Sequence, residues 1–136
     1  MSGKLKVVDL FCGAGGLHIG FERSGFHTQL CIDNNLQVEK THKLNFPNIP
    51  FINRDIALIS SEEIATYIDG ELDVMAGGPP CQGFSTIGKR SSSDPEKRSA
   101  HDPRNELVIT YAKLISDLKP KFIVMENVKG ILTMDK

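Results

Sequence analysis

The sequence is poor in the residues that mark several protein classes. Its 136 residues contain no tryptophan and three cysteines, Cys12, Cys31 and Cys81. An odd number of cysteines without a C-x-x-C pair argues against a disulfide framework and against a zinc site, so we expect no bound metal. No apolar run approaches the length of about 20 residues that a membrane helix needs, and the N-terminus lacks the apolar core of a signal peptide. We therefore expect a reduced, cytoplasmic protein with no membrane contact.

An excess of charge of one sign is also lacking. Sixteen Lys and Arg residues face 17 Asp and Glu residues, with a formal net charge of -1. This balance argues against a chain that holds nucleic acid by bulk electrostatics alone. The chain is 40% hydrophobic and 24% charged, which is ordinary for a globular protein, and its length predicts a single domain over residues 1–136.

Hydrophobic patterns of strand and helix type alternate along the chain. Apolar runs predict strands at residues 5–11, 28–32, 50–52, 72–76 and 121–126. Helical spacing predicts helices at 17–24, 35–45 and 104–118, and a further helix beginning at Ser60 or Ser61. This alternation predicts an α/β fold with about five parallel strands and flanking helices. Ligands of such sheets bind outside the carboxyl ends of the strands, where the unusual residues of this chain fall.

The turn after the first strand is rich in glycine. Gly13, Gly15 and Gly16 bring bare backbone to the N-terminus of a helix, and Asp33, at the end of the second strand, can accept both hydroxyls of a ribose. The pattern is not G-x-G-x-x-G, because position 18 is histidine, so a nucleoside without phosphates fits better than a dinucleotide. Asp55, after the third strand, could accept from an adenine amino group. A tight turn without a ligand and a surface aspartate are the plainer alternatives.

A cysteine and a glutamate end two further strands. Pro79 and Pro80 fix two φ angles before Cys81 and hold its thiol stiffly at the mouth of the sheet, which favours a nucleophile over a structural cysteine. Cys12 and Cys31 are better interpreted as small apolar fillers. Glu126 follows an apolar strand and is expected to be partly desolvated, which would let its carboxyl share a proton; a surface glutamate is the alternative.

The segment 83–104 has more basic than acidic side chains and contains glycines and serines. A long segment without regular structure is usually functional or disordered. We expect a lid that closes over the site and meets phosphates, with a merely solvated loop as the alternative.

Three motifs together resemble the cytosine-C5 DNA methyltransferase family. Residues 9–16 read D-L-F-C-G-A-G-G and are similar to its first motif, residues 78–85 read G-P-P-C-Q-G-F-S and are similar to its catalytic motif, and residues 126–128 read E-N-V. The motifs occur in the family's order, and the resemblance spans essentially the whole chain. It identifies the N-terminal catalytic part of such an enzyme.

The resemblance implies the class I methyltransferase fold, which is Rossmann-like, and S-adenosyl-L-methionine as cofactor. By similarity, the first turn would cradle the cofactor, Asp33 would bind its ribose, Asp55 and Ile56 would contact the adenine edge, and Pro80 and Leu107 would line the methionine end. Family members often have an apolar side chain beside the adenine where this chain has Asn34. The turn residues so implied are Phe11, Gly13, Ala14, Gly15, Gly16 and Leu17.

The resemblance also implies the reaction, which methylates C5 of cytosine in DNA, typically in a restriction-modification context in the bacterial cytosol or nucleoid. The Cys81 thiolate would attack C6 of a cytosine flipped out of double-stranded DNA, with Glu126 at N3 and the 4-amino group. C5 would take the methyl group, and loss of the C5 proton would expel Cys81.

Family members continue with a Q-x-R-x-R motif, a target recognition region and a late segment that completes the cofactor pocket. None of these occurs in the 136 residues, so we expect a complementing polypeptide or a missing C-terminal part, and low activity of the chain alone. Without that part the strand at 121–126 would be an apolar edge. The alternatives are an inactive remnant, a cofactor-binding module that needs a partner chain, and a relative that methylates cytosine in tRNA.

Overall fold

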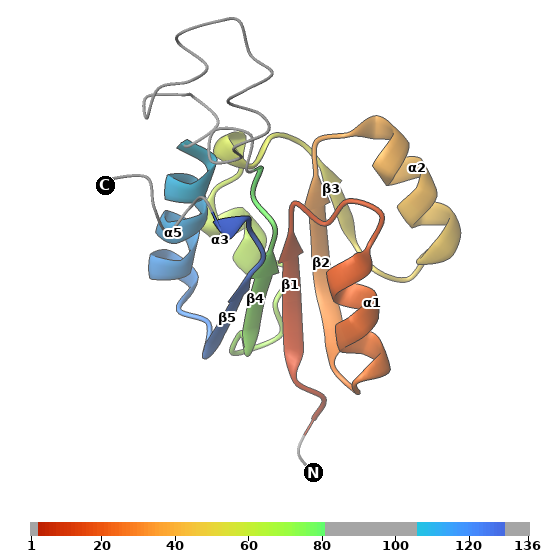
Figure 1. Cartoon of the computed structure of the whole chain (residues 1–136). Coiled ribbons are helices and arrows are strands. Elements are labelled where there is room, and N and C mark those ends of the chain that lie inside the picture. The colour runs from red at the N-terminus through yellow and green to blue at the C-terminus, as the bar shows by residue number, and fades with distance from the viewer. Residues whose placement is uncertain (1–2, 81–105, 130–136) are drawn as a thin grey trace, which may run out of the picture.

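The computed structural model describes residues 3–80 and 106–129. Strands and helices alternate in the predicted order (Figure 1). Cys81 and the segment 83–104 lie outside the described residues. The strands are β1 (Lys6–Leu10), β2 (His27–Asp33), β3 (Phe51–Asn53), β4 (Val74–Gly77) and β5 (Phe122–Met125), and the helices are α1 (Gly16–Arg23), α2 (Leu36–Asn45), the 3-10 helix η1 (Ile56–Leu58), α3 (Ser61–Ala65) and α5 (Glu106–Leu118).

The five strands form one sheet in the order β3-β2-β1-β4-β5. Every neighbouring pair is parallel, so the prediction of a parallel α/β sheet is confirmed. The chain runs outward from β1 to β3, returns to β4 beside β1 and then proceeds to β5. The order therefore reverses between β1 and β4, and in doubly wound sheets this is where ligands bind.

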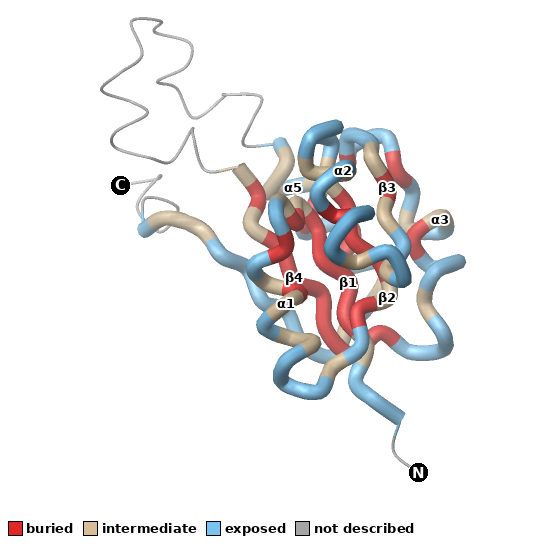
Figure 2. The backbone as a smooth tube through the Cα atoms, turned by 90° about the vertical axis from the view of Figure 1, so that its right-hand side faces the viewer, coloured by how far each residue is buried: buried red, intermediate tan, exposed pale blue. Residues whose placement is uncertain are grey.

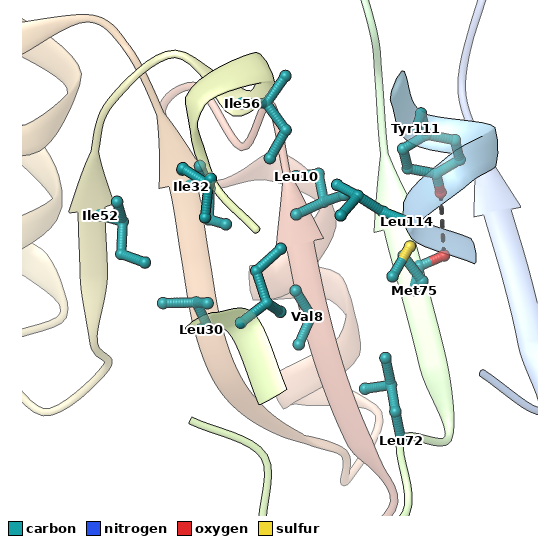
Figure 3. Packing of buried hydrophobic residues seen from close by; sticks show 12 residues of the cluster. Val8, Leu10, Leu30, Ile32, Ile52, Ile56, Leu72, Met75, Tyr111 and Leu114 are labelled. Atoms are coloured by element: carbon teal, nitrogen blue, oxygen red, sulfur yellow. Dashed lines mark hydrogen bonds between the residues drawn. The ribbon is translucent and has the colours of Figure 1, made fainter. Parts of the chain in front are cut away.

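Helices cover both faces of the sheet. Val8 and Leu10 of β1 point to the face that carries η1, α3 and α5, where Tyr111 and Leu114 complete the main core (Figure 3). Val7 points to the opposite face and packs in a smaller cluster with Val74 and Ala76 beneath α1. The alternation of side chains along a strand thus gives β1 two buried faces, as a central parallel strand requires.

Local hydrogen bonds fix the helix starts. The Asn35 side chain accepts from the backbone N–H of Gln37 at 2.8 Å and caps α2. Ser60 accepts from the backbone N–H of Glu63 at 3.1 Å, so the predicted helix start is confirmed at Ser60. Such caps satisfy backbone donors that have no partner within the helix.

The last strand lies at the edge of the described sheet, as predicted. All four β5 residues are at least 39% exposed, and Phe122 is 66% exposed. By contrast, β1 and β4 are buried along most of their length (Figure 2). The exposed apolar surface of β5 is unusual for a parallel strand, which is normally covered on both faces. Among the described residues, no helix has the length and apolar character needed to cross a membrane.

Candidate active site at the carboxyl ends of the strands

The turn between β1 and α1 uses left-handed backbone. Phe11 has a φ of 57°, and Gly13 and Gly15 have φ values of 52° and 102°. The Cys12 N–H donates to the carbonyl of Ile32 at 3.0 Å, and the Gly15 N–H donates to the carbonyl of Cys12 at 3.0 Å. A bulky residue with positive φ is uncommon and often marks a functional turn. The turn therefore holds Phe11 at the carboxyl end of the sheet, next to the end of β2.

Asp33 is held rigidly beside this turn. Its Oδ2 accepts from the Gly13 N–H at 3.0 Å, and its Oδ1 accepts from the Asn35 N–H at 2.9 Å. Each carboxylate oxygen has further lone pairs, so a ligand hydroxyl can still donate to Asp33. The prediction that Asp33 ends the second strand is confirmed.

A cavity of about 210 Å³ opens where the strand order reverses. Seven residues that the sequence analysis singled out line it. The cavity joins the end of β2 and the start of η1 to the segment after β4 and the first turn of α5. These seven lining residues are Phe11, Asp33, Asn34, Asp55, Ile56, Pro80 and Leu107.

Three further lining residues, Ile32, Arg54 and Gly78, were missed by sequence reasoning. Each is a direct neighbour of a predicted residue or of the Pro-Pro pair, and that adjacency was the available signal. The Arg54 guanidinium donates to both carboxylate oxygens of Glu63, at 3.2 Å and 2.5 Å, so its charge is paired at the rim.

Asp55 also serves as the N-cap of η1. Its Oδ1 accepts from the Ala57 N–H at 2.9 Å and caps η1. The carboxyl group lines the cavity and is exposed, so its second oxygen can meet a ligand. The cap gives the aspartate a reason to be present without any ligand, and the adenine contact stays a prediction.

The rest of the glycine turn lies away from the cavity lining. Leu17 packs its side chain against the cluster of Val7, Val74 and Ala76. Together with Gly16, Leu17 borders a separate groove on the α1 face. The predicted role of Leu17 in cofactor binding can therefore be played only by its backbone, and the same groove reaches Val124 of β5.

The ends of β4 and β5 meet beside the cavity. The Glu126 N–H donates to the Gly77 carbonyl at 2.9 Å, and the Asn127 amide donates to the Pro79 carbonyl at 3.3 Å. A Cβ added at Gly78 would lie 3.1 Å from Glu126 Oε2, so the carboxylate rests on bare backbone two residues before Pro80. Glu126 is exposed, and the expectation that it is partly desolvated is wrong for the described residues, because β5 is the sheet edge.

Tyr111 of α5 contacts the backbone of both β4 and β5. Its buried hydroxyl lies 3.1 Å from the carbonyl of Met75 in β4 and 3.4 Å from that of Val124 in β5 (Figure 3 shows the first bond). Burial raises the pKa of the Tyr111 hydroxyl above its usual value, so it remains a donor at neutral pH. The tyrosine thereby helps to hold the carboxyl ends of β4 and β5 in register.

Two of the three cysteines are buried as expected. Cys12 and Cys31 are free thiols inside the protein. Hydrogen bonding with Cys12 and burial raise the pKa of the Cys31 thiol far above its usual range. Since a thiolate is the reactive form, Cys31 is not a nucleophile. The predicted nucleophile Cys81 follows directly on the last described residue of the segment, Pro80, and lies outside the described residues.

The profile of one protein family covers nearly the whole chain. The family described as C-5 cytosine-specific DNA methylase matches residues 5–136. The chain belongs to the C-5 cytosine-specific DNA methylase family.

Named relatives of this C-5 cytosine-specific methylase chain are longer proteins. The type II methyltransferase M.AquIA of Picosynechococcus sp. is 40% identical over 134 residues, which cover 96% of this chain and 51% of that relative. The type II methyltransferase M.DdeI of Desulfomicrobium norvegicum is 37% identical over 130 residues, which cover 96% of this chain and 29% of the relative. The chain thus spans between about a third and a half of the length of these proteins.

Solved structures agree with the methylase fold. A protein assigned as a DNA modification methyltransferase, encoded within an E. coli prophage, superposes with a TM-score of 0.77 at 36% identity, over 95% of this chain and 33% of that one. A variant of DNMT2 from Spodoptera frugiperda superposes with a TM-score of 0.70 at 27% identity, over 97% of this chain and 38% of that one. The predicted class I, Rossmann-like methyltransferase fold is therefore confirmed.

Proposed function

We propose that residues 1–136 form a single S-adenosylmethionine-binding and catalytic domain of a DNA (cytosine-5-)-methyltransferase. One observation carries this proposal. The cavity at the strand reversal is lined by seven of the residues expected to hold the cofactor, and it opens beside the segment 78–80, where Glu126 lies against Gly78 and Asn127 donates to the Pro79 carbonyl. A nucleoside pocket and a carboxylate beside the segment that leads to the predicted nucleophile are two parts that cytosine methylation needs.

The lining fits an adenosyl group joined to an amino acid. Phe11, Ile32 and Ile56 offer apolar surface to a purine, and Asp33 is a fixed acceptor for ribose hydroxyls. No phosphate needs to be accommodated, which agrees with a turn that departs from the dinucleotide pattern.

The methionine end would lie between Pro80 and Leu107, with Asn34 and Asp55 at the adenine rim. The remaining turn residues, Gly13 to Leu17, would contribute backbone only. S-adenosylmethionine, when bound, supplies a methyl group on a positively charged sulfur.

The protein's own residues would prepare the cytosine ring. The Cys81 thiolate forms a bond to C6, and the ring electrons shift toward C5, which becomes nucleophilic. Glu126, on the rim beside Gly78, would hydrogen-bond N3 and the 4-amino group and stabilise the protonated ring. Once C5 carries its methyl group, removal of the C5 proton restores the double bond between C5 and C6 and expels Cys81. These atoms are inaccessible within a base pair, so the cytosine must be flipped out of the duplex.

The substrate and the completing part also belong to this proposal. The relatives are type II methyltransferases, and the chain covers 51% of one and 29% of another. The exposed apolar edge β5 and the groove shared by Leu17, Phe21 and Val124 offer the surface that further chain or a second polypeptide would cover. DNA recognition would lie largely in that part, which agrees with the formal net charge of -1 on the chain.

A trapped adduct tests the proposal. The chain is combined with its completing part, S-adenosylmethionine and duplex DNA that carries 5-fluorocytosine. Fluorine cannot leave C5 as a proton does, so the Cys81–C6 bond should persist and be found by mass spectrometry of the peptide that contains Cys81. Cys81→Ala should form no adduct and transfer no methyl group, while it binds S-adenosylmethionine within about twofold of the unchanged chain. Methyl transfer by Cys81→Ala would disprove the nucleophile, and cofactor binding without any transfer would favour a cofactor-binding module.

A further inference from the structure

A group of side chains that carry possible metal-ligand atoms lies beneath α1 and α2, on the sheet face opposite the main core. His18 of α1, Cys31 of β2 and His42 of α2 meet there, and one ligand atom of each lies within 4.8 Å of the others. All three are buried, with exposures of 0%, 0% and 2%. The residues come from three separate elements, so tertiary packing alone brings them together.

Several polar atoms of this group have nothing to bond. Both ring nitrogens of His42 and Nε2 of His18 have no hydrogen-bond partner among the residues that the structure describes. Buried polar atoms are normally satisfied, because each loses its bonds to water. Two imidazoles with unsatisfied nitrogens beside a thiol are unfavourable as simple core packing and well suited to a shared ligand.

The carboxylate of Asp9 contacts one histidine of the group. Asp9 Oδ2 lies 3.2 Å from Nδ1 of His18 and also accepts from the His18 backbone N–H at 3.2 Å. Histidines that bind metals commonly donate their other ring N–H to such a carboxylate, which fixes the tautomer and the ring orientation. That arrangement would leave Nε2, the unsatisfied nitrogen, as the free donor atom of His18.

Aromatic rings pack against the two histidines. The ring of Phe46 lies 4.8 Å from that of His18, and the ring of Phe51 lies 4.7 Å from that of His42, measured between centroids. Cys31 Sγ lies 3.4 Å from Nδ1 of His18. A tetrahedral zinc ion with bonds of about 2.0–2.3 Å needs its nitrogen and sulfur ligands roughly 3.5 Å apart. The 3.4 Å contact of the sulfur involves the nitrogen that Asp9 holds, and the ligand atoms of the three residues lie within 4.8 Å of one another, so the side chains must reorient and move closer by roughly 1 Å to enclose a cation.

We propose that His18, Cys31 and His42 bind one borderline-soft divalent cation of the zinc class, with Asp9 as the positioning residue for His18. Imidazole and thiolate bind such ions in preference to alkaline-earth ions, which favour oxygen ligands. On binding, the Cys31 thiol loses its proton to solvent and the sulfur bonds the ion, so the change is acid-base and needs no oxidant.

The site would be structural, since it would pin α1 and α2 to β2. It differs from the cofactor cavity in every ligand and lies on the other face of the sheet. It also departs from the expectation, drawn from cysteine spacing, that the chain has no zinc site.

Cobalt(II) is the probe of choice, because its spectrum reports sulfur ligation. The chain, stripped by a chelator and checked for folding by circular dichroism, is titrated with Co²⁺ and then with Zn²⁺. We expect one equivalent of Co²⁺ to produce a thiolate-to-cobalt charge-transfer band, and Zn²⁺ to abolish it. Zn²⁺ at 100 times its dissociation constant should also raise Tm by roughly several degrees. A folded chain that shows no charge-transfer band would overturn the proposal.

Variants assign the ligands. Cys31→Ser should lose the charge-transfer band, and His42→Phe, which keeps an aromatic ring at this position, should weaken Zn²⁺ binding at least about 100-fold. His27→Gln, at an exposed histidine outside the group, is the matched control and should bind like the unchanged chain. Retention of the band in Cys31→Ser, or its loss in His27→Gln, would overturn the assignment.

Discussion

Replacing Tyr111 by phenylalanine should lower the free energy of unfolding by about 1 kcal/mol, because one buried hydrogen bond is lost. The hydroxyl has a single hydrogen, and its two acceptors are 3.1 Å and 3.4 Å away. Both distances exceed the usual 2.7–2.8 Å of an O–H···O bond, so the two contacts together amount to about one ordinary bond. The ring itself is kept, so the core around Leu114 and Leu10 stays filled.

Urea unfolding followed by circular dichroism measures this loss. Tyr67→Phe is the matched control, since Tyr67 is the other of the two tyrosines and is 39% exposed. We expect the control to change stability by less than about 0.5 kcal/mol. A loss below about 0.3 kcal/mol for Tyr111→Phe, or equal losses for both variants, would refute the role given to the hydroxyl.

The same tyrosine predicts an alkaline dependence. Burial raises the pKa of Tyr111 above its usual value of about 10, so above pH 10 the unfolded chain has released a proton that the folded chain still holds. Stability should therefore fall as pH rises above about 10, by up to 1.4 kcal/mol per pH unit. In Tyr67→Phe, whose tyrosinate absorbance reports Tyr111 alone, ionisation should coincide with unfolding. Ionisation within the folded chain near pH 10 would contradict this.

Three other substitutions test the turn, the cofactor cavity and the sheet. Gly15→Ala should destabilise by roughly 2–4 kcal/mol in thermal unfolding, because φ is 102° and the new Cβ would lie 2.5 Å from the buried His18 ring; a neutral effect would refute the turn geometry. Asp33→Asn, which keeps an acceptor for the Gly13 N–H, should weaken S-adenosylmethionine binding about 10-fold or more by calorimetry; unchanged affinity would remove Asp33 from the site. Asp73 accepts from a lysine ammonium and a backbone N–H that lower its pKa, so its contribution is present above about pH 4 and is lost as pH falls below it. Asp73→Asn should flatten the decline of Tm between pH 4 and pH 2, and an unchanged slope would contradict that assignment.

Much of the fold followed from local pattern. Strands, helices and the Ser60 cap were predicted within a few residues, because buried parallel strands form apolar runs and caps have short sequence signatures. Two of the seven cavity residues, Asp33 and Asp55, were predicted from their places after strands, since residues that end parallel strands share one edge of the sheet, and the other five were implied by the family resemblance. The exposure of Glu126 was not predicted correctly, because burial depends on what lies beside β5 rather than on the residues around the glutamate.

Local sequence patterns were enough to predict where the chain changes direction and which residues end each strand, because glycine, proline and hydrophobic periodicity act over a few neighbouring residues. The position of β4 between β1 and β5, which rests the Glu126 carboxylate on Gly78, became known from the folded structure alone. The folded structure alone also shows that His18 and His42 meet at Cys31. Both juxtapositions depend on contacts between residues far apart in the chain, and these arise from strand order and helix packing, which no local pattern specifies.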